Sequence, residues 1–339
     1  MHQLVGLAVR DQRDAELFGA LESRLSSAAA GTIRRFPFIS LPLLPHISRM
    51  TDSAMRFSSL SLPFRPSAFP ALARGAWFAL GMLILAALGL AIDPRVITGA
   101  PAWLKPFKFA LSMLLYVGTL AFMVRELPRT RALRLALRAT SVLLTLEVVA
   151  IFVQAARGTS SHFNIDTPLD TAIFSSMGVG IAVVWLSSAV ILWLHLRTPG
   201  GDRAMALAFR LGLTLNILGA GVGWTMTRPF PGQIEAISRG VHPFVAGAHT
   251  VGAADGGAGL PITRWSTDHG DLRIAHFVGM HALQLLPLLL LGIRLVRQAA
   301  DDDFERAALI VATAAYLAAF VALLLQALNG HPLVPLSGS

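Results

Sequence analysis

The sequence predicts an all-α, polytopic membrane helix bundle with about seven transmembrane helices. Of its 339 residues, 54% are hydrophobic and only 14% are charged, and the mean hydropathy is +0.62. Soluble domains carry roughly 25% charged residues, so this chain has too few charges for a water-exposed surface. Its apolar residues also fall into blocks of about 20, the length with which a helix crosses a hydrocarbon core of about 30 Å.

The composition also narrows the chemistry and the partners of the chain. Because cysteine is absent, disulfides, thiolate metal sites and cysteine nucleophiles are excluded. The formal net charge is +9, but the arginines cluster beside apolar blocks, where they act as topology signals rather than as nucleic-acid contacts. We therefore expect the lipid bilayer as partner, no nucleic acid, and a small-molecule or ion ligand; the oligomeric state stays open.

Residues 1–70 differ in composition from the rest of the chain. This segment is rich in Arg, Ser and Pro and has no apolar stretch long enough to span a membrane. It also lacks the order of charged, apolar and small residues that marks a signal peptide. We expect a poorly ordered, basic cytoplasmic extension, and we expect a chain beginning at Met55 to insert normally.

Seven apolar blocks follow, within a transmembrane domain that we place at residues 71–330. A long outer loop, residues 227–272, is expected between the fifth and sixth spans, with a short amphipathic helix near residues 232–239. Residues 331–339 form a short outer tail. The expected spans are, in order, residues 77–92, 106–124, 135–156, 171–196, 205–226, 274–295 and 307–328.

The basic residues in the short turns predict the orientation, because positive charge resists translocation. Two turns carry clusters of arginine. The turn between the second and third spans has Arg125, Arg129, Arg131, Arg134 and Arg138, and the turn between the sixth and seventh spans has Arg294, Arg297 and Arg306. Both turns are expected in the cytoplasm, which gives an N-in/C-out protein of the bacterial inner membrane. Lys105 and Lys108 are exceptions, at the outer end of the second span.

Most histidines fall on the outer side in this orientation. Only His2, His46 and His195 are expected inside, whereas the outer set is His162, His242, His249, His269, His276, His281 and His331. We therefore expect the polar chemistry to be extracytoplasmic.

The third span carries Glu147 near the middle of the membrane, and Gln154 one heptad later lies on the same helical face. Ionisable residues at such depth are costly, so they usually face the bundle interior and mark a functional path. We predict Glu147 as a catalytic residue, with ligand-binding roles for Gln154, Arg157, His162 and Asn164. The alternative is that Glu147 only joins helices through hydrogen bonds.

The sixth span places His276, His281 and Gln284 along one apolar helix. The two histidines are about 140° apart on the helix, unlike the i, i+4 pair of a zinc-binding helix. We predict His281 as catalytic and Gln284 as ligand-binding, with His276, His281, His162 and His249 as metal-ligand candidates. The alternative is that both span-six histidines form interhelical hydrogen bonds.

Two further ligand-binding candidates come from neighbouring spans. Asn216 lies on a stripe of small residues in the fifth span, where another helix can approach closely. Lys108 enters the outer half from the second span as a candidate counter-ion of Glu147, although we favour snorkelling of its side chain to the interface.

The outer loop contains acidic residues and histidines that offer oxygen and nitrogen ligands to a cation. Their spacing matches no defined ion-binding loop. For Asp255 we favour turn chemistry instead, because it precedes Gly256. The loop residues concerned are Asp255, Asp268, His269 and Asp271.

Three segments resemble an uncharacterised bacterial integral-membrane family over roughly residues 75–330. They are residues 103–112 (WLKPFKFALS), residues 154–164 (QAARG followed by SHFN), and residues 270–284, which include GDLR, AHF and MHALQ. This resemblance implies the class of protein and no activity. In outline the chain is also similar to the membrane zinc hydrolases related to alkaline ceramidase, but their paired-histidine pattern is not met here.

Three functions stay open on the sequence. The first, which we favour, is a membrane enzyme or cofactor protein with a metal ion or haem held near the outer surface. The second is a proton-coupled transporter or permease with an intramembrane relay of Glu147, Asn216, His281 and Gln284. The third is a non-catalytic assembly or sensor protein. We place the site between the third and sixth spans, with His281 nearest Glu147 and His276 nearest His162.

Overall fold

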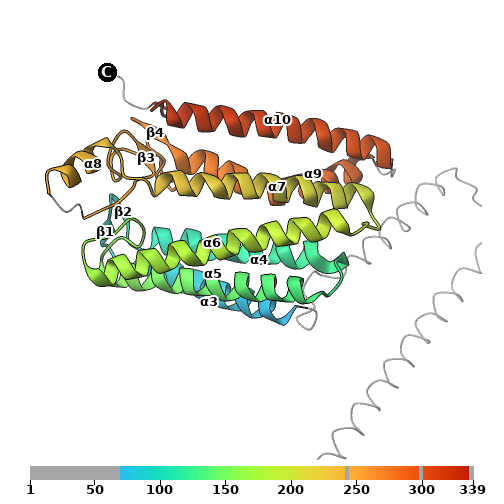
Figure 1. Cartoon of the computed structure of the whole chain (residues 1–339), viewed down its shortest axis with the longest axis horizontal. Coiled ribbons are helices and arrows are strands. Elements are labelled where there is room, and N and C mark those ends of the chain that lie inside the picture. The colour runs from blue at the N-terminus through green and yellow to red at the C-terminus, as the bar shows by residue number, and fades with distance from the viewer. Residues whose placement is uncertain (1–68, 241–243, 298–300, 336–339) are drawn as a thin grey trace, which may run out of the picture. The chain divides into compact units, whose positions relative to one another are not determined.

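A computed structural model describes residues 69–240, 244–297 and 301–335, apart from a few side chains (Figure 1). In these ranges seven helices are long and apolar enough to cross a membrane, which confirms the predicted class of multipass helical membrane protein. The extension expected at residues 1–70 lies almost wholly outside the described residues. The long helices are α3 (Pro70–Ile92), α4 (Leu104–Met123), α5 (Arg131–Arg157), α6 (Pro168–Arg197), α7 (Arg203–Met226), α9 (Leu272–Arg297) and α10 (Asp302–Leu328).

Each long helix includes its expected span, except that Val124 lies in a 3-10 turn directly after α4. Several helices begin a few residues earlier than expected because polar residues cap them. Thr130 accepts a hydrogen bond from the Leu133 backbone at the start of α5, and Thr167 does the same for α6. Asp202 and Asp301 cap α7 and α10 in this way. A cap satisfies backbone N–H groups that have no partner inside the helix, so helices start at the cap and not at the first apolar residue.

Two groups of helices pack within the bundle. α3, α4, α5 and α6 form one group, and α7, α9 and α10 form the other, with α6 in contact with α7 (Figure 1). Buried apolar side chains from α3, α4, α5, α7 and α9 belong to one continuous cluster, so the two groups share a core.

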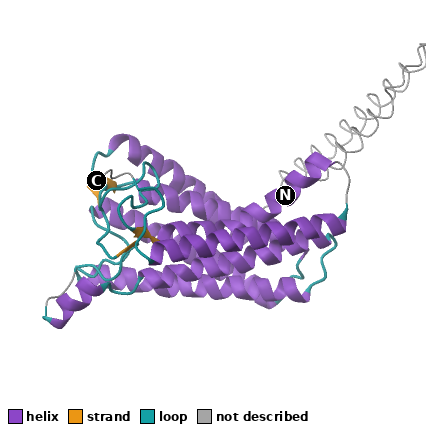
Figure 2. Ribbon diagram, turned by 90° about the horizontal axis from the view of Figure 1, so that it is seen from above, coloured by secondary structure: helices purple, strands orange, loops and turns teal. Residues whose placement is uncertain are grey.

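The two ends of the bundle differ. One end, which we call the loop end, holds the short strands, α8 and most of the irregular chain (Figure 2). The other, which we call the Arg-rich end, holds the turns between α4 and α5, α6 and α7, and α9 and α10. How the ends are oriented in a membrane stays a prediction.

Short elements order the loop end. β1 (Val96–Ile97) pairs with β2 (Ala100–Pro101), and β3 (Thr250–Val251) pairs antiparallel with β4 (Gly270–Asp271). The second pairing ties the middle of the long outer loop to the start of α9. The helix α8 (Pro231–Ser238) confirms the short helix expected in this loop.

The closest helix crossing joins α7 to α9. A Cβ added at Gly219 would lie 2.5 Å from the Cα of Gly279, so neither position has room for a side chain. Asn216, one turn earlier, donates a hydrogen bond to the Met280 carbonyl at 2.9 Å. The small-residue stripe expected on the fifth span therefore serves a helix contact, as its composition indicated.

Candidate functional site

A cavity of about 380 Å³ opens at the loop end between the start of α4 and the long outer loop. Segments far apart in the sequence supply its walls, so the cavity exists only in the folded chain. Its polar and charged lining includes Lys105, Lys108, Ser160, Ser161, His162, Gln233, His249, Thr250, Asp255, Arg264, Ser266, Asp268, His269 and Arg273.

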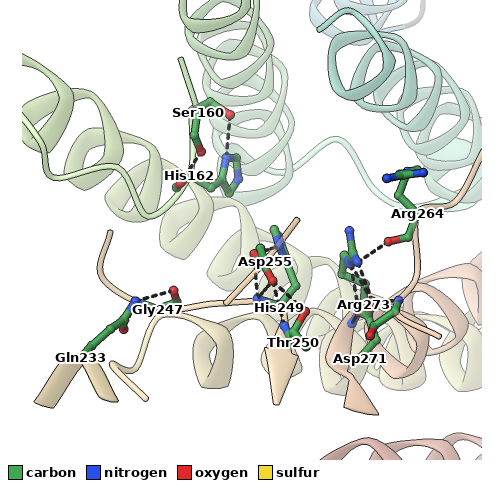
Figure 3. A network of polar contacts seen from close by, with 12 residues as sticks. Ser160, His162, Gln233, Gly247, His249, Thr250, Asp255, Arg264, Asp271 and Arg273 are labelled. Carbon is green, nitrogen blue, oxygen red and sulfur yellow. Dashed lines mark hydrogen bonds and ion pairs between the residues drawn. The ribbon is translucent and has the colours of Figure 1, made fainter. Parts of the chain in front are cut away.

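An Asp–His pair, drawn in Figure 3, lines this cavity. The Nδ1 atom of His249 lies 2.5 Å from Oδ2 of Asp255, and both side chains are about one-fifth exposed. Asp255 also accepts hydrogen bonds from the backbone N–H groups of His249 and Thr250 and from the Thr250 hydroxyl. Four donors therefore converge on one carboxylate, which fixes the His249 ring.

The protonation states of the pair follow from these contacts. Burial raises the pKa of Asp255, but the hydrogen bonds from His249 and Thr250 outweigh it and hold that pKa well below its usual value. Burial lowers the pKa of His249, which the bond to Asp255 opposes only in part. An ionised carboxylate accepts and cannot donate, so Nδ1–H of a neutral His249 donates to Asp255. The other ring nitrogen, Nε2, is then free to accept a proton.

A second pair lies at the end of α5. Oε1 of Glu147 is 3.5 Å from Nε2 of His162, and Nδ1 of the same ring is 3.1 Å from the Ser161 hydroxyl. The Glu147 contact is longer than an ordinary hydrogen bond of about 2.9 Å, so it is a close polar contact. Burial, followed by the positive charge of Lys105, holds the pKa of His162 well below its usual value.

The depth of Glu147 follows from an aromatic contact. Phe152 meets Trp103, the residue before α4, with ring centroids 5.7 Å apart. Glu147 precedes Phe152 by five residues, so it lies about 7.5 Å below the level at which α4 begins. This depth lets a loop residue, His162, reach it.

Phe163 connects the two pairs. Its ring centroid is 6.2 Å from that of His162 and 4.9 Å from that of His249. Phe163 has a φ of +63°, and Thr98 and Arg264, which also line the cavity, have φ of +47° and +58°. Non-glycine residues in this region cost on the order of 1–3 kcal/mol each and cluster at functional sites.

Two lysines supply positive charge to the cavity, and they are the only lysines among the 339 residues of the chain. Lys108 Nζ donates to the Thr263 carbonyl at 3.3 Å, and Lys105 Nζ lies 5.9 Å from the centre of the Phe109 ring. Among the described residues, neither ammonium has a carboxylate within 4.0 Å. Among the described ion pairs, Lys108 does not pair with Glu147, a pairing that the sequence reasoning named but ranked below snorkelling.

Arginine adds to this positive charge, because Arg264 and Arg273 line the same cavity. Arg273 forms an ion pair with the fully buried Asp271 at 2.5 Å and also donates to the Arg264 carbonyl at 2.5 Å. Asp271 in turn accepts a hydrogen bond from the Ser266 backbone. Asp271 therefore orders the loop through these contacts.

Three predicted ligand-binding residues form contacts that tie the chain together. Gln154 and Arg157 both donate to Asp170 near the start of α6, at 2.8 and 2.6 Å, and Arg157 also donates to the Gln154 side chain. Asn164 donates to Thr159 and accepts from the Asp166 backbone. None of the three lines the cavity.

The span-six candidates lie apart from Glu147. The ring nitrogen Nδ1 of His276 contacts the Gly219 carbonyl at 2.7 Å, and Nδ1 of His281 contacts the Phe277 carbonyl of its own helix at 2.8 Å. His281 also stacks on Phe277, with centroids 4.0 Å apart. The expected meeting of His281 with Glu147 is not among the polar contacts that the structure describes. The physical reason is that α9 packs mainly on α7 and α10, whereas α5 packs on α6, α3 and α4.

The four metal-ligand candidates fall into two groups. His162 and His249 line one cavity, whereas His276 and His281 bond to backbone carbonyls of the α7–α9 region. Within the described ranges, no three His, Asp or Glu side chains converge in a way that would hold a metal ion. Gln284 has a buried Oε1 without a hydrogen-bond partner there.

The sequence reasoning missed the roles of Lys105, Arg264 and Arg273, and it took Asp255 as a turn residue. One available signal was the restriction of lysine to positions 105 and 108 in an arginine-rich chain. The pairing of Asp255 with His249 had no such signal, because a separation of six residues in a loop brings side chains together only after folding.

Comparisons with known proteins assign no function to this chain, so functional conclusions rest on the geometry of the site. No protein-family model, curated protein or solved structure matches this chain. The two resemblances drawn from sequence segments therefore gain no support from these comparisons. The chain is a multipass helical membrane protein, and the cavity at its loop end is its candidate functional site.

Proposed function

We propose that this protein is a membrane enzyme that binds a small anionic substrate in the loop-end cavity and uses His249 as a general base. One observation carries the proposal: the Asp255–His249 pair, with a free Nε2, lines the same cavity as two lysines that have no described carboxylate partner. A histidine oriented by a carboxylate is a common acid–base arrangement, and a nearby cation holds the anionic substrate in place.

The charges of the lining support an anionic ligand. Of the two carboxylates on the cavity wall, Asp255 accepts hydrogen bonds from four donors, and Asp268 is exposed. Lys105, Lys108 and Arg264 add positive charge to the same lining. A volume of about 380 Å³ suits a metabolite-sized molecule with a carboxylate or phosphate group.

A binding experiment tests the first half of the proposal. Phosphate, sulfate, acetate and citrate are titrated against the purified protein in nanodiscs, with chloride as the reference anion. At least one of them is expected to raise the unfolding temperature in a saturable way. Replacing Lys108 with methionine is expected to weaken this binding about 10- to 100-fold, because a charge-assisted hydrogen bond contributes about 1.5–3 kcal/mol.

Matched variants make the result specific. Lys108→Arg retains the charge and is expected to retain most of the binding, and Arg131→Met removes a charge at the other end of the bundle. Equal binding by Lys108→Met and the wild type, or the absence of any anion effect beyond that of chloride, contradicts the proposal.

The Glu147–His162 contact favours one second candidate, a proton-coupled transporter. His162 lines the cavity and Glu147 lies behind it, toward the bundle interior, so a proton has two adjacent acceptors along this direction. Proteoliposomes that contain the protein and a pH-sensitive dye distinguish the two functions. Anion-dependent proton entry supports transport, whereas turnover of a bound anion without proton entry supports the enzyme.

A further inference from the structure

A separate groove of about 720 Å³ lies at the Arg-rich end, between the starts of α7 and α10. Its lining contains both charged and apolar side chains. The residues that matter are Arg203, Leu207 and Arg210 on α7, and Arg306, Ala307 and Ile310 on α10.

A partly buried ion cluster holds the walls of the groove in place. Arg294 of α9 lies 2.6 Å from Asp202, the cap of α7, and 2.7 Å from Glu305 in the first turn of α10. One arginine therefore fixes three helices relative to one another. Its single positive charge offsets one of the two negative charges of these carboxylates.

The charge that remains along the groove is positive. Arg203 is exposed and has no carboxylate within 4.0 Å among the described residues. Arg210 donates through Nε and Nη2 to the carbonyl oxygens of His195 and Thr198, so its guanidinium sits at the groove without a described anionic partner. Arg306 is paired with Asp303 at 2.8 Å. Both helices also begin here, and their N-terminal dipole ends favour negative charge.

Apolar side chains line the groove beside these arginines. Leu207 is half-buried, and Ala307 and Ile310 are exposed, because α10 covers α7 incompletely at this point. Few residues of α10 are buried, and only Glu305 and Leu309 of them lie in its first half. From Arg203 to Arg210 the α7 helix descends about 10 Å, which is the passage from the headgroup level to the acyl chains.

We propose that this groove is a binding site for an anionic phospholipid, with the phosphate at Arg203 and one acyl chain along Leu207 and Ile310. Arginine beside an apolar groove matches both parts of such a lipid, and basic pockets between membrane helices recognise anionic headgroups through the same charges. A free anion would use only the charged part. The site is independent of the loop-end cavity.

Lipid titration of the delipidated full-length protein tests this site. Short-chain phosphatidylglycerol, short-chain phosphatidylcholine and inorganic phosphate are added separately, and the unfolding temperature is followed. Phosphatidylglycerol is expected to stabilise the protein at lower concentration than phosphatidylcholine, and phosphate alone is expected to have no such effect. Arg203→Gln is expected to raise the half-effective phosphatidylglycerol concentration about fivefold, the change for one surface arginine.

Two further variants separate this site from general surface charge. Arg131→Gln removes an exposed arginine at the same end, on α5, and is expected to leave the titration close to that of the wild type. Ala307→Trp fills the groove without changing charge and is expected to reduce the phosphatidylglycerol effect to that of phosphatidylcholine. Equal weakening by Arg203→Gln and Arg131→Gln overturns the proposal, as does stabilisation by phosphate alone that matches the lipid.

Discussion

The carboxylate of Glu147 lies 3.5 Å from the imidazole of His162, a residue that follows α5 and folds back beside it. Glu147 is 5% exposed. Its described ion-pair contact is with a residue of the irregular chain at the loop end and not with a residue of another span. This contact links the interior of the bundle to the wall of the loop-end cavity, which His162 lines.

A double-mutant cycle measures that contact. Glu147→Gln, His162→Ala and the double variant are compared by the free energy of unfolding in detergent. Because the side chains are buried and in contact, we expect a coupling energy of about 1–3 kcal/mol. Glu235→Gln combined with His162→Ala is the control, since Glu235 is exposed on α8. A coupling no larger than that of the control pair would show that Glu147 and His162 act independently.

Asp255 is expected to organise the long outer loop. Asp255→Asn replaces an acceptor of four hydrogen bonds with a group that also donates, and we expect a loss of about 2–3 kcal/mol of stability. Hydrogen exchange should become faster in residues 249–272, where protection now depends on this carboxylate. Asp268→Asn is the matched control, because Asp268 is exposed and accepts only a 3.3 Å bond from Thr267. If both variants exchange at the wild-type rate, Asp255 has no organising role.

The stability of the protein is expected to fall on acidification below about pH 6.5, which is the usual pKa of histidine. In the folded protein the pKa values of His162 and His249 are lowered, by burial above all, so the unfolded chain binds protons that the folded chain does not. Stability is therefore complete above pH 6.5 and is lost as the pH decreases, by up to about 1.4 kcal/mol per pH unit for each histidine.

Asp255 extends this loss to lower pH, since its pKa is lowered and its contribution disappears only below its usual value of 3.8. Unfolding temperatures measured between pH 8 and pH 3 check the prediction, with His162→Gln expected to flatten the upper part of the curve. A curve for His162→Gln that is parallel to the wild type would exclude His162 as a source of the dependence.

The close crossing of α7 and α9 gives a prediction about glycine. A Cβ at Gly219 would lie 2.5 Å from backbone atoms of Gly279, whereas a Cβ at Gly221 meets nothing within 4 Å. Gly219→Ala should force the helices apart and cost about 1–3 kcal/mol. Gly221→Ala should be neutral or stabilising by up to about 1 kcal/mol, because alanine favours the helix. Thermal unfolding of both variants provides the measurement, and equal unfolding temperatures would be evidence against the close crossing.

The membrane orientation is open to a direct test. Because the turn that contains Arg125 and Arg138 carries the densest positive charge, we expect a reporter there to be active in the cytoplasm. A reporter after residue 339 should be active outside, since seven helices separate it from the N-terminal side. Alkaline phosphatase and green fluorescent protein fusions give opposite signals on the two sides, and a cytoplasmic C-terminus would refute the N-in/C-out prediction.

The sequence alone determined the class of protein and the positions of its helices. Hydrophobic blocks of a membrane's width are local features, and the bilayer requires each of them to satisfy its backbone hydrogen bonds as a helix. The same reasoning located α8, and it recognised the small-residue stripe around Asn216 as a helix contact. It named both Glu147 and His162 as site residues, but it expected His281 beside Glu147, whereas the described contact is with His162.

Only the tertiary structure decided which polar residues meet. The depth of a residue along a helix follows from its number, but the neighbour of that helix does not, and α5 and α9 belong to different packing groups. Loop residues are still less predictable, because Asp255 reaches His249, and Lys105 and Lys108 reach the same cavity, through backbone turns with positive φ that no periodicity encodes. Non-local contacts of this kind depend on the whole packed chain, which is why the cavity became visible only in three dimensions.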